Sequence, residues 1–406
     1  MNPATATLTA LSPLDGRYKR QTALLAAYFS EFGLIRYRVR VEVEYFLALR
    51  AALGRPVEDD VATRLRDLYR HFAAGDAQAV KAHEATIRHD VKAVEYWLKQ
   101  QLVEFPALAG DMELVHAGLT SEDVNNLAYA LMHKEALTQV MLPAIASVLS
   151  PLMDLVAAHR ATPMLARTHG QAATPTTMGK ELGVFLARLT AETKRLVDVS
   201  LPGKLNGATG TFAAQALAFP QVDWPAFSKA FITGLGLTPN VLTTQIEPHD
   251  GLAALYDTLR RLDNILIDFC QDMWRYISDG YFAQRARDEE VGSSAMPHKV
   301  NPIDFENAEG NAGLANALFI HMADKLTKSR LQRDLSDSTV LRNAGVAFGY
   351  AIVAYQNVTK GLARVAVDEA KLAADLEAHP EVIAEAIQTV LRAEGAAVPY
   401  ETLKSL

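Results

Sequence analysis

The chain has 406 residues, of which 50% are hydrophobic and 21% are charged, and its formal net charge is −7. A chain of this length is too long for one ordinary core, so we expect two or three domains. The negative charge argues against an extended surface for nucleic acid or for an anionic membrane, because such surfaces depend on clustered lysine and arginine.

The single cysteine, Cys270, excludes an intramolecular disulfide and a thiolate zinc site, and it favours a reducing compartment such as the cytoplasm. Cys270 lies among apolar helix positions, which favours an inert thiol over a nucleophile. The N-terminus has no long apolar segment, so no signal peptide is expected. The most apolar run, 140–158, is interrupted by Pro143, Pro151 and Asp154, and it is not expected to span a membrane.

The first part of the chain shows helical periodicity. Apolar residues recur every three or four positions from 28 to 53, and a glycine and a proline follow that stretch. Two further helices are predicted over 61–72 and 90–102. Turn-forming residues then break the pattern, so we predict an N-terminal helical domain over residues 1–112.

The middle of the chain, residues 113–364, is predicted to be a bundle of long helices. Thr120 and Ser121 stand ahead of two acids, as at a helix N-terminus, and a helix of about thirty residues, bent or broken at its prolines, follows them. The clearest periodicity lies in 252–276, where large apolar residues alternate steps of three and four. Such a seam requires partner helices on each side. Further helices are predicted over 176–199, 305–326 and 339–362.

The last part of the chain, residues 365–406, is predicted to form a short helical C-terminal domain, punctuated by a His-Pro pair and a glycine. Neither an alternating set of strands nor an internal repeat is found. The expected fold class is therefore all-α, with three domains over 1–112, 113–364 and 365–406.

One loop concentrates small, hydroxyl and cationic groups. Residues 292–302 read Gly-Ser-Ser-Ala-Met-Pro-His-Lys-Val-Asn-Pro. Gly292 permits positive φ and close approach of the backbone to a ligand, and the two prolines prevent a helix. Backbone N–H groups together with Lys299 and Asn301 suit a carboxylate or a developing negative charge. A Ser/Pro-rich connector is the simpler alternative for the Gly-Ser-Ser tripeptide taken alone.

This string resembles the signature loop of the fumarase/aspartase superfamily, and its Met-Pro-His-Lys segment is similar to the adenylosuccinate lyase branch in its bacterial form. The resemblance continues in order along nearly the whole chain, in the segments 15–18, 89–95, 120–123, 167–171 and 244–250. It implies a three-domain fold with a central long-helix bundle. It also implies a homotetramer in which each active site takes loops from three subunits.

The resemblance further implies a reaction, the elimination of fumarate from a succinylated purine nucleotide. The implied substrates are adenylosuccinate, which gives AMP, and the succinylated carboxamide ribotide of purine biosynthesis, which gives AICAR. Ser293 would be the base, activated by Lys299 and the loop backbone, and His169 would be the acid that protonates the leaving nitrogen. The histidines form no metal-ligand motif, so neither a metal nor another cofactor is expected.

The substrate contacts are implied in the same way. The nucleotide end is expected at Arg17 and Tyr18, and the phosphate at the segment that contains Arg333, Ser338 and Arg342. The complete set of implied substrate-binding residues is Arg17, Tyr18, Arg88, His89, Asp90, His116, Thr120, Ser121, Gln245, Ser294, Lys299, Asn301, Arg333, Ser338, Thr339 and Arg342.

Simpler interpretations stay open for several of these residues. Spacing alone favours helix capping for Thr120 and Ser121, and a solvated helix face for the arginines. Arg88 stands where members of the family often have Asn, and Ala295 where many have a hydroxyl residue, and both departures could alter substrate contacts. For His89 and His116, taken in isolation, a structural role is an equal alternative.

Two other functions also stay open. Argininosuccinate lyase belongs to the same superfamily, although the expected phosphate-binding segment argues against it. A non-catalytic helical scaffold is the other alternative. Members of the resembled family usually continue for several dozen residues beyond the position of Leu406, so we expect the C-terminal domain to be incomplete, which slightly favours the scaffold.

Overall fold

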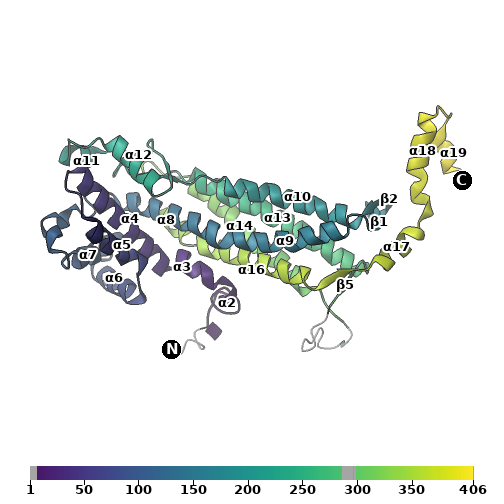
Figure 1. Cartoon of the computed structure of the whole chain (residues 1–406), viewed down its shortest axis with the longest axis horizontal. Coiled ribbons are helices and arrows are strands. Elements are labelled where there is room, and N and C mark those ends of the chain that lie inside the picture. Colours follow the sequence, from purple (N-terminus) through teal and green to yellow (C-terminus); the bar gives the residue numbers. More distant parts are fainter. Residues whose placement is uncertain (1–6, 286–295, 297–298, 406) are drawn as a thin grey trace. The chain divides into compact units, whose positions relative to one another are not determined.

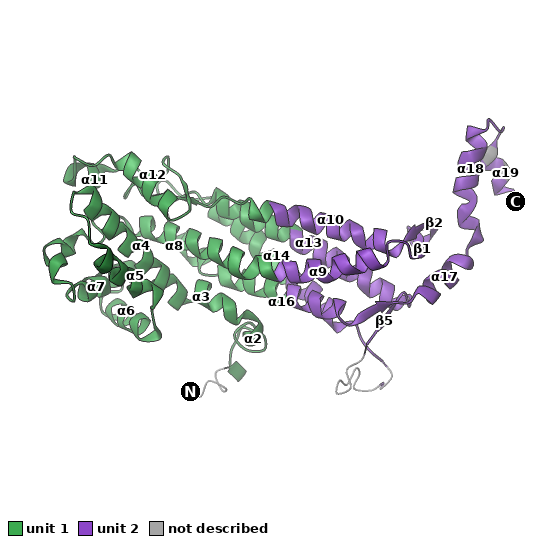
Figure 2. Ribbon diagram, in the orientation of Figure 1, with its two compact units in different colours: residues 1–143, 195–261, 314–353 green, residues 144–194, 262–313, 354–406 purple. Residues whose placement is uncertain are grey.

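A computed structural model describes residues 7–285, 296 and 299–405 (Figure 1). Its regular structure is almost entirely helical, as predicted. The chain divides into two compact units (Figure 2). Unit 1 comprises Met1–Pro143, Arg195–Arg261 and Leu314–Val353, and unit 2 comprises Ala144–Lys194, Leu262–Gly313 and Ala354–Leu406. These units do not follow the boundaries expected after residues 112 and 364, and the three-domain division remains a prediction.

The N-terminal part of unit 1 is a cluster of helices around α4. Its elements are α2 (Lys19–Thr22), η1 (Ala23–Leu25), α3 (Ala26–Phe29), α4 (Glu31–Ala52), α5 (Asp59–Arg70), α6 (Ala74–Ile87), α7 (Asp90–Leu102) and η2 (Pro106–Leu114). Ser30 caps α4 by accepting a hydrogen bond from Gly33 N at 3.1 Å. Val39, Val43 and Trp97 belong to the core cluster of this part. Helix α6 was not predicted, because Val80 is its only buried residue and no apolar period marks it.

The rest of unit 1 carries half of the predicted binding residues. Its elements include α8 (Ser121–Ala136), the π-helical turn η3 (Leu137–Met141), β3 (Pro202–Gly203), α11 (Ala213–Ala218), α12 (Trp224–Gly234), β4 (Thr238–Pro239) and α15 (Ser336–Leu341). Strands β3 and β4 pair in parallel. His133 on α8 is fully buried, and its Nε2 lies 2.7 Å from the Tyr256 hydroxyl, which makes it a packing residue.

Besides α9 (Leu142–Ala158), four long helices contribute residues to both units. They are α10 (Met178–Val197), α13 (Asp250–Ser278), α14 (Ile303–Leu326) and α16 (Ala344–Leu362). The seam predicted on α13 is confirmed, since Leu255, Leu259 and Phe269 are each at most 1% exposed. Cys270 on the same helix is also buried, and burial raises the pKa of its thiol well above the ordinary value, which confirms an inert group.

The helical run from α8 through η3 to α9 (Leu142–Ala158) is continuous past both of its prolines. The π-helical turn immediately precedes Pro143, whose missing N–H cannot bond to the carbonyl four residues earlier. The run Ser121–Ala158 is long and apolar enough to cross a membrane by length and composition alone. A core helix meets the same criteria, and Asp123 is fully buried in this run.

Unit 2 contains the strands β1 (Pro163–Thr168), β2 (Gln171–Thr177), β5 (Phe282–Gln284) and β6 (Val365–Val367), and the helical elements α17 (Glu369–Glu377), η4 (Pro380–Ile383), α18 (Ala384–Ala393) and α19 (Pro399–Lys404). Strands β1 and β2 form an antiparallel hairpin, and β5 pairs antiparallel with β6. The hairpin was not predicted, because its threonines and prolines hide any alternation of apolar and polar residues. Arg167 of β1 donates a hydrogen bond to Asp375 of α17 at 3.0 Å.

The core of unit 2 contains a buried carboxyl group. Asp263 on α13 is fully buried, and one of its oxygens accepts a hydrogen bond from the Tyr355 hydroxyl at 2.7 Å. Burial raises the pKa of Asp263 from 3.8 to about 8. The folded protein therefore binds more protons than the unfolded chain between these two pH values, and its stability falls as the pH rises across that interval.

We expect Asp263→Asn to remove this pH dependence. At pH 8 the variant should be more stable than the wild type by about 1–3 kcal/mol, because it no longer buries a charge that has one partner. Melting temperatures of both proteins between pH 5 and pH 8 test this, with Asp257→Asn, at a half-buried position of the same helix, as the control. Parallel curves for wild type and Asp263→Asn would contradict the prediction.

Candidate active site

The N-terminus of α8 carries the predicted carboxylate-binding residues Thr120 and Ser121. Thr120 is the N-cap, and its backbone N–H donates to Asp123 Oδ2 at 2.9 Å. The helix is therefore capped, as the spacing predicts, but the Asp123 carboxylate and not the Thr120 hydroxyl accepts this hydrogen bond. Both residues remain partly exposed, so their hydroxyls and the first N–H groups of a sixteen-residue helix are available to an anion.

Asp123 also fixes the loop that follows β3. Its Oδ1 accepts hydrogen bonds from the backbone N–H of Asn206 at 3.0 Å and of Gly207 at 3.3 Å. The Lys204 ammonium lies 2.8 Å from the same oxygen, and both side chains are fully buried. Asn126 adds two bonds to the backbone of Lys204. The loop that contains Lys204, Asn206 and Gly207 is therefore a structural support for the start of α8.

His116 lies just before α8 and forms an ion pair with a buried acid. Its Nδ1 is 2.5 Å from Glu42 Oε1, and Glu42 is fully buried in α4. Burial opposes protonation of the imidazole, but the Glu42 carboxylate outweighs it, so the pKa of His116 is raised above its ordinary value. The backbone of His116 has φ of 60°, which turns the chain toward α8. A protonated imidazole here can receive a carboxylate.

Asp90 and Arg342, two of the predicted binding residues, lie together. Asp90 Oδ2 is 2.7 Å from Arg38 and 3.0 Å from Arg342, and Glu31 is 2.7 Å from Arg342. Burial raises the pKa of Asp90, but Arg38 and its other partners outweigh burial and lower it. The neighbouring His89 is exposed and caps α7 by accepting a hydrogen bond from the backbone N–H three residues on, at 3.1 Å.

Arg342 also lines a cleft of about 400 Å³, together with Asp15, Lys19 and Ser30. The predicted nucleotide contacts Arg17 and Tyr18 belong to the same N-terminal segment, with Arg17 exposed and Tyr18 half-buried. Three further predicted residues lie at or near the surface of unit 1: Arg88, Ser338 and Thr339.

Arg333 joins three segments of unit 1. Its Nη1 donates to Gln245 Oε1 at 3.2 Å and lies 3.2 Å from Glu122 Oε2. Gln245 is in turn held by Ala208, whose carbonyl accepts from its amide at 2.9 Å. Glu122 is almost completely buried, and burial raises its pKa to about 7 although Arg333 opposes the shift. The predicted contacts Gln245 and Arg333 are therefore neighbours.

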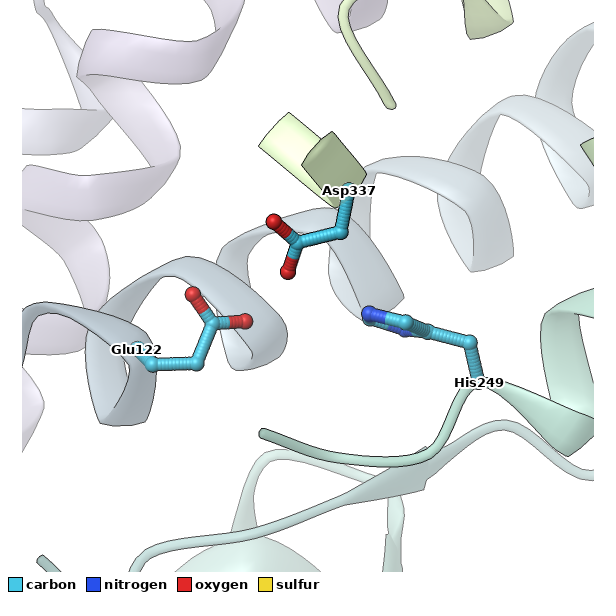
Figure 3. A group of neighbouring side chains, drawn as sticks. All are labelled: Glu122, His249 and Asp337. Carbon is cyan, nitrogen blue, oxygen red and sulfur yellow. The ribbon is translucent and has the colours of Figure 1, made fainter. Parts of the chain in front are cut away.

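Glu122 also belongs to the one group of potential metal ligands that the described residues contain. Glu122, His249 and Asp337 each offer an atom within 4.8 Å of the others, and all three are buried. Figure 3 shows their side chains directed toward one another. A carboxylate and imidazole set of this kind suits a divalent cation in principle, but the Arg333 guanidinium already supplies a cation to Glu122.

His169, the predicted acid, lies at the tip of the β1–β2 hairpin in unit 2. Thr168 pairs with Gln171, so His169 and Gly170 are the two turn residues. Their φ values are 54° and 74°, as a type I′ turn requires. The side chain is exposed.

The signature loop is described only in part. Ser293 and Ser294 lie outside the described residues. Lys299 is exposed, and its backbone N–H donates to Met296 O at 3.1 Å. Asn301 is half-buried. The described part of the loop and His169 belong to unit 2, and the other described site residues belong to unit 1.

The residues that sequence reasoning missed are mostly buried acids. Glu122 and Asp337 each lie beside a predicted contact, which is the only signal that marks them. Glu42 interrupts an apolar helix face, but nothing in its local sequence points to His116, which lies 74 positions away.

Comparison with known proteins assigns the family. A family described as "Lyase" matches residues 16–315, and one described as "Adenylosuccinate lyase C-terminal" matches residues 329–406. The chain is 52% identical to the adenylosuccinate lyase of Legionella pneumophila (strain Corby) over 98% of its own length and 88% of that protein. The chain belongs to the adenylosuccinate lyase family. The corresponding values for Escherichia coli (strain K12) are 48%, 99% and 89%, and for Dictyostelium discoideum 48%, 98% and 88%.

Solved structures of related folds agree with this family. A fumarate lyase from Mesorhizobium sp. BNC1 superposes with a TM-score of 0.75 at 20% identity, covering 94% of this chain and 85% of that one. The 3-carboxy-cis,cis-muconate lactonizing enzyme from Pseudomonas putida gives 0.74 at 21% identity, covering 94% and 84%. At these identities the likeness concerns the fold alone, and it confirms the all-α fold of the fumarase/aspartase superfamily.

Removal of the Asp123 charge should destabilise the protein. In Asp123→Asn the buried Lys204 ammonium loses its carboxylate, so we expect a loss of about 3–5 kcal/mol in the free energy of unfolding. Urea denaturation followed by circular dichroism measures it. Asp324→Asn removes an exposed acid next to Lys328 and should leave the denaturation curve unchanged. A similarly small change for Asp123→Asn would show that the pair does not support this region.

Neutralising Glu42 should lower the pKa of His116. Without the carboxylate, burial dominates and disfavours the imidazolium. NMR titration of the His116 ring in wild type and in Glu42→Gln measures the shift. Glu44→Gln, on the same helix but paired with Arg66, is the control and should leave this pKa unchanged. An unaltered His116 pKa in Glu42→Gln would refute the pairing.

Proposed function

We propose that this lyase eliminates fumarate from adenylosuccinate, giving AMP, and from the succinylated aminoimidazole carboxamide ribotide, giving AICAR. Similarity to adenylosuccinate lyases along nearly the whole chain carries the proposal. The described binding residues supply what such substrates need, since they place several cationic groups in an otherwise acidic protein.

The reaction requires a base, a place for negative charge and an acid. Ser293 takes a proton from the methylene carbon of the succinyl group, which is not bonded to the leaving nitrogen. The electron pair is held in the carboxylate attached to that carbon. Lys299 and the loop N–H groups stabilise this charge. The C–N bond then breaks, fumarate forms, and His169 gives a proton to the departing nitrogen.

The anionic groups of the substrate are assigned to separate parts of unit 1. Arg333 and Arg342 are the cations proposed for the phosphate, each already oriented by an acidic partner. Thr120 and Ser121, at the N-terminus of α8, are proposed for a succinyl carboxylate. His116, whose protonation is favoured by Glu42, lies four residues before Thr120 and is proposed to orient the same group.

We also propose a cytoplasmic homotetramer whose active sites are shared between subunits. The long helices expose large apolar side chains that a single chain leaves uncovered. These are Met153 (55% exposed), Val184 (43%), Trp274 (45%), Ile303 (48%), Leu314 (51%) and Ile320 (52%). Exposed apolar groups of this kind mark helix surfaces that pack on another copy. The unpaired cysteine is consistent with a reducing compartment.

The direct test of the function is to incubate the purified protein with adenylosuccinate and to assay AMP and fumarate together. Equal amounts of both products are expected. Cleavage of argininosuccinate instead would favour the other lyase of the superfamily. A folded tetramer that releases neither product from either substrate would favour the scaffold.

Replacement of the proposed base or acid should stop turnover without disturbing assembly. We expect Ser293→Ala and His169→Gln each to lower kcat at least about a hundredfold, because each removes one proton-transfer group. Light scattering and activity assays measure both effects. If sites are shared, a mixture of the two inactive variants should regain activity after subunit exchange. Normal turnover by Ser293→Ala would exclude Ser293 as the base.

A further inference from the structure

Three segments distant in sequence converge on the Arg333 guanidinium. Glu122 comes from the first turn of α8, Gln245 from the segment before α13, and Arg333 from the segment before α15. The same Nη1 atom lies 3.2 Å from the Gln245 oxygen and 3.2 Å from the Glu122 carboxylate. One nitrogen with two acceptors leaves the remaining donors of the planar guanidinium for other partners.

The Glu122 carboxylate is more deeply buried than the arginine it contacts. Glu122 is 2% exposed, whereas the Arg333 side chain is 17% exposed. The arginine therefore lies between a buried acid and the surface of unit 1. The opposite oxygen, Glu122 Oε1, has no hydrogen-bond partner among the described residues, and neither has Nε2 of the equally buried His249. Figure 3 shows both groups directed toward Asp337.

These buried groups are best explained by the cation that is present. Arg333 lowers the pKa of Glu122 and of Asp337 against the larger effect of burial. Burial, His133 and Arg333 all lower the pKa of His249, which leaves its imidazole neutral. Arg333 uses one nitrogen for both acceptors and its side chain is 17% exposed, so the other N–H groups of the guanidinium can contact an anion. Arg333 is thus oriented and still able to attract an anion.

We propose that Glu122 is a positioning residue that directs the Arg333 guanidinium toward the anionic end of the substrate. This inference rests on the proposed function, in which Arg333 contacts the nucleotide phosphate. Glu122 orients the guanidinium through the position of its acceptor oxygen, and its negative charge is not required. Asp337 and His249 are the buried neighbours of this carboxylate, each with a polar atom within 4.8 Å of it.

Two conservative variants separate position from charge. Glu122→Gln keeps an acceptor oxygen at the same reach but removes the charge. Glu122→Asp keeps the charge but withdraws the oxygens by one carbon–carbon bond, about 1.5 Å. We expect Glu122→Asp to bind AMP at least about tenfold more weakly than wild type, and Glu122→Gln to stay within about threefold, because charge-assisted hydrogen bonds depend steeply on geometry.

Adenosine, which lacks the phosphate, serves as the second probe. Isothermal titration of each variant with AMP and with adenosine should show the Glu122→Asp loss for AMP alone. Glu135→Asp is the matched control, because it shortens another acid of α8 that is paired with an arginine, Arg40, and it should leave both affinities unchanged. Arg333→Ala combined with Glu122→Asp should weaken AMP binding no more than Arg333→Ala does.

Three results would overturn the inference. Equal losses for AMP and adenosine would indicate a general structural role. Weak AMP binding by Glu122→Gln with normal binding by Glu122→Asp would show that charge decides. Normal binding by both variants would show that Glu122 does not position Arg333. Failure of the proposed function would be seen in a different experiment, because the wild type would then release neither AMP nor fumarate from adenylosuccinate.

Discussion

The contact between Asp123 and Lys204 supports the larger part of the described site. It joins two segments 81 positions apart. Asp123 also accepts hydrogen bonds from the backbone of the α8 N-cap and from two backbone N–H groups of the loop after β3. A buried ion pair is stable only when its remaining hydrogen-bonding capacity is also satisfied, and this pair meets that condition through Gly207 and the loop backbone. The N-terminus of α8 is consequently held at a fixed point, and Thr120, Ser121 and Glu122 inherit their positions from it.

Around that point, three cationic groups of the candidate site are each accompanied by an acid. Arg333 has Glu122, Arg342 has Glu31 and Asp90, and His116 has Glu42. An isolated cation in a half-buried position would be costly and mobile, whereas a cation with one acidic partner is oriented and still carries donors for a ligand. This pairing explains how a chain with net charge −7 can present positive groups locally.

The sequence predicted the helical class and the long helices, since these depend on local periodicity, and short motifs marked the proposed binding segments. The seam of α13 illustrates this, because a repeat of three and four residues specifies one buried face. The β1–β2 hairpin and the role of Glu122 could not be found in the same way. The hairpin depends on a two-residue turn at positive φ. The burial of Glu122 depends on Arg333, which lies 211 positions further along the chain. Interactions between such distant segments leave no local pattern.

The hairpin that carries His169 also determines whether the histidine loses conformational entropy during folding or during ligand binding. A two-residue turn between paired strands leaves the histidine backbone few alternatives, and the link from Arg167 to α17 restrains the first strand. A histidine on a long loop would have to be ordered each time a substrate bound, at the expense of affinity. Here the backbone is ordered once, when the chain folds, and only the side-chain bonds of the imidazole remain to be ordered when a ligand binds.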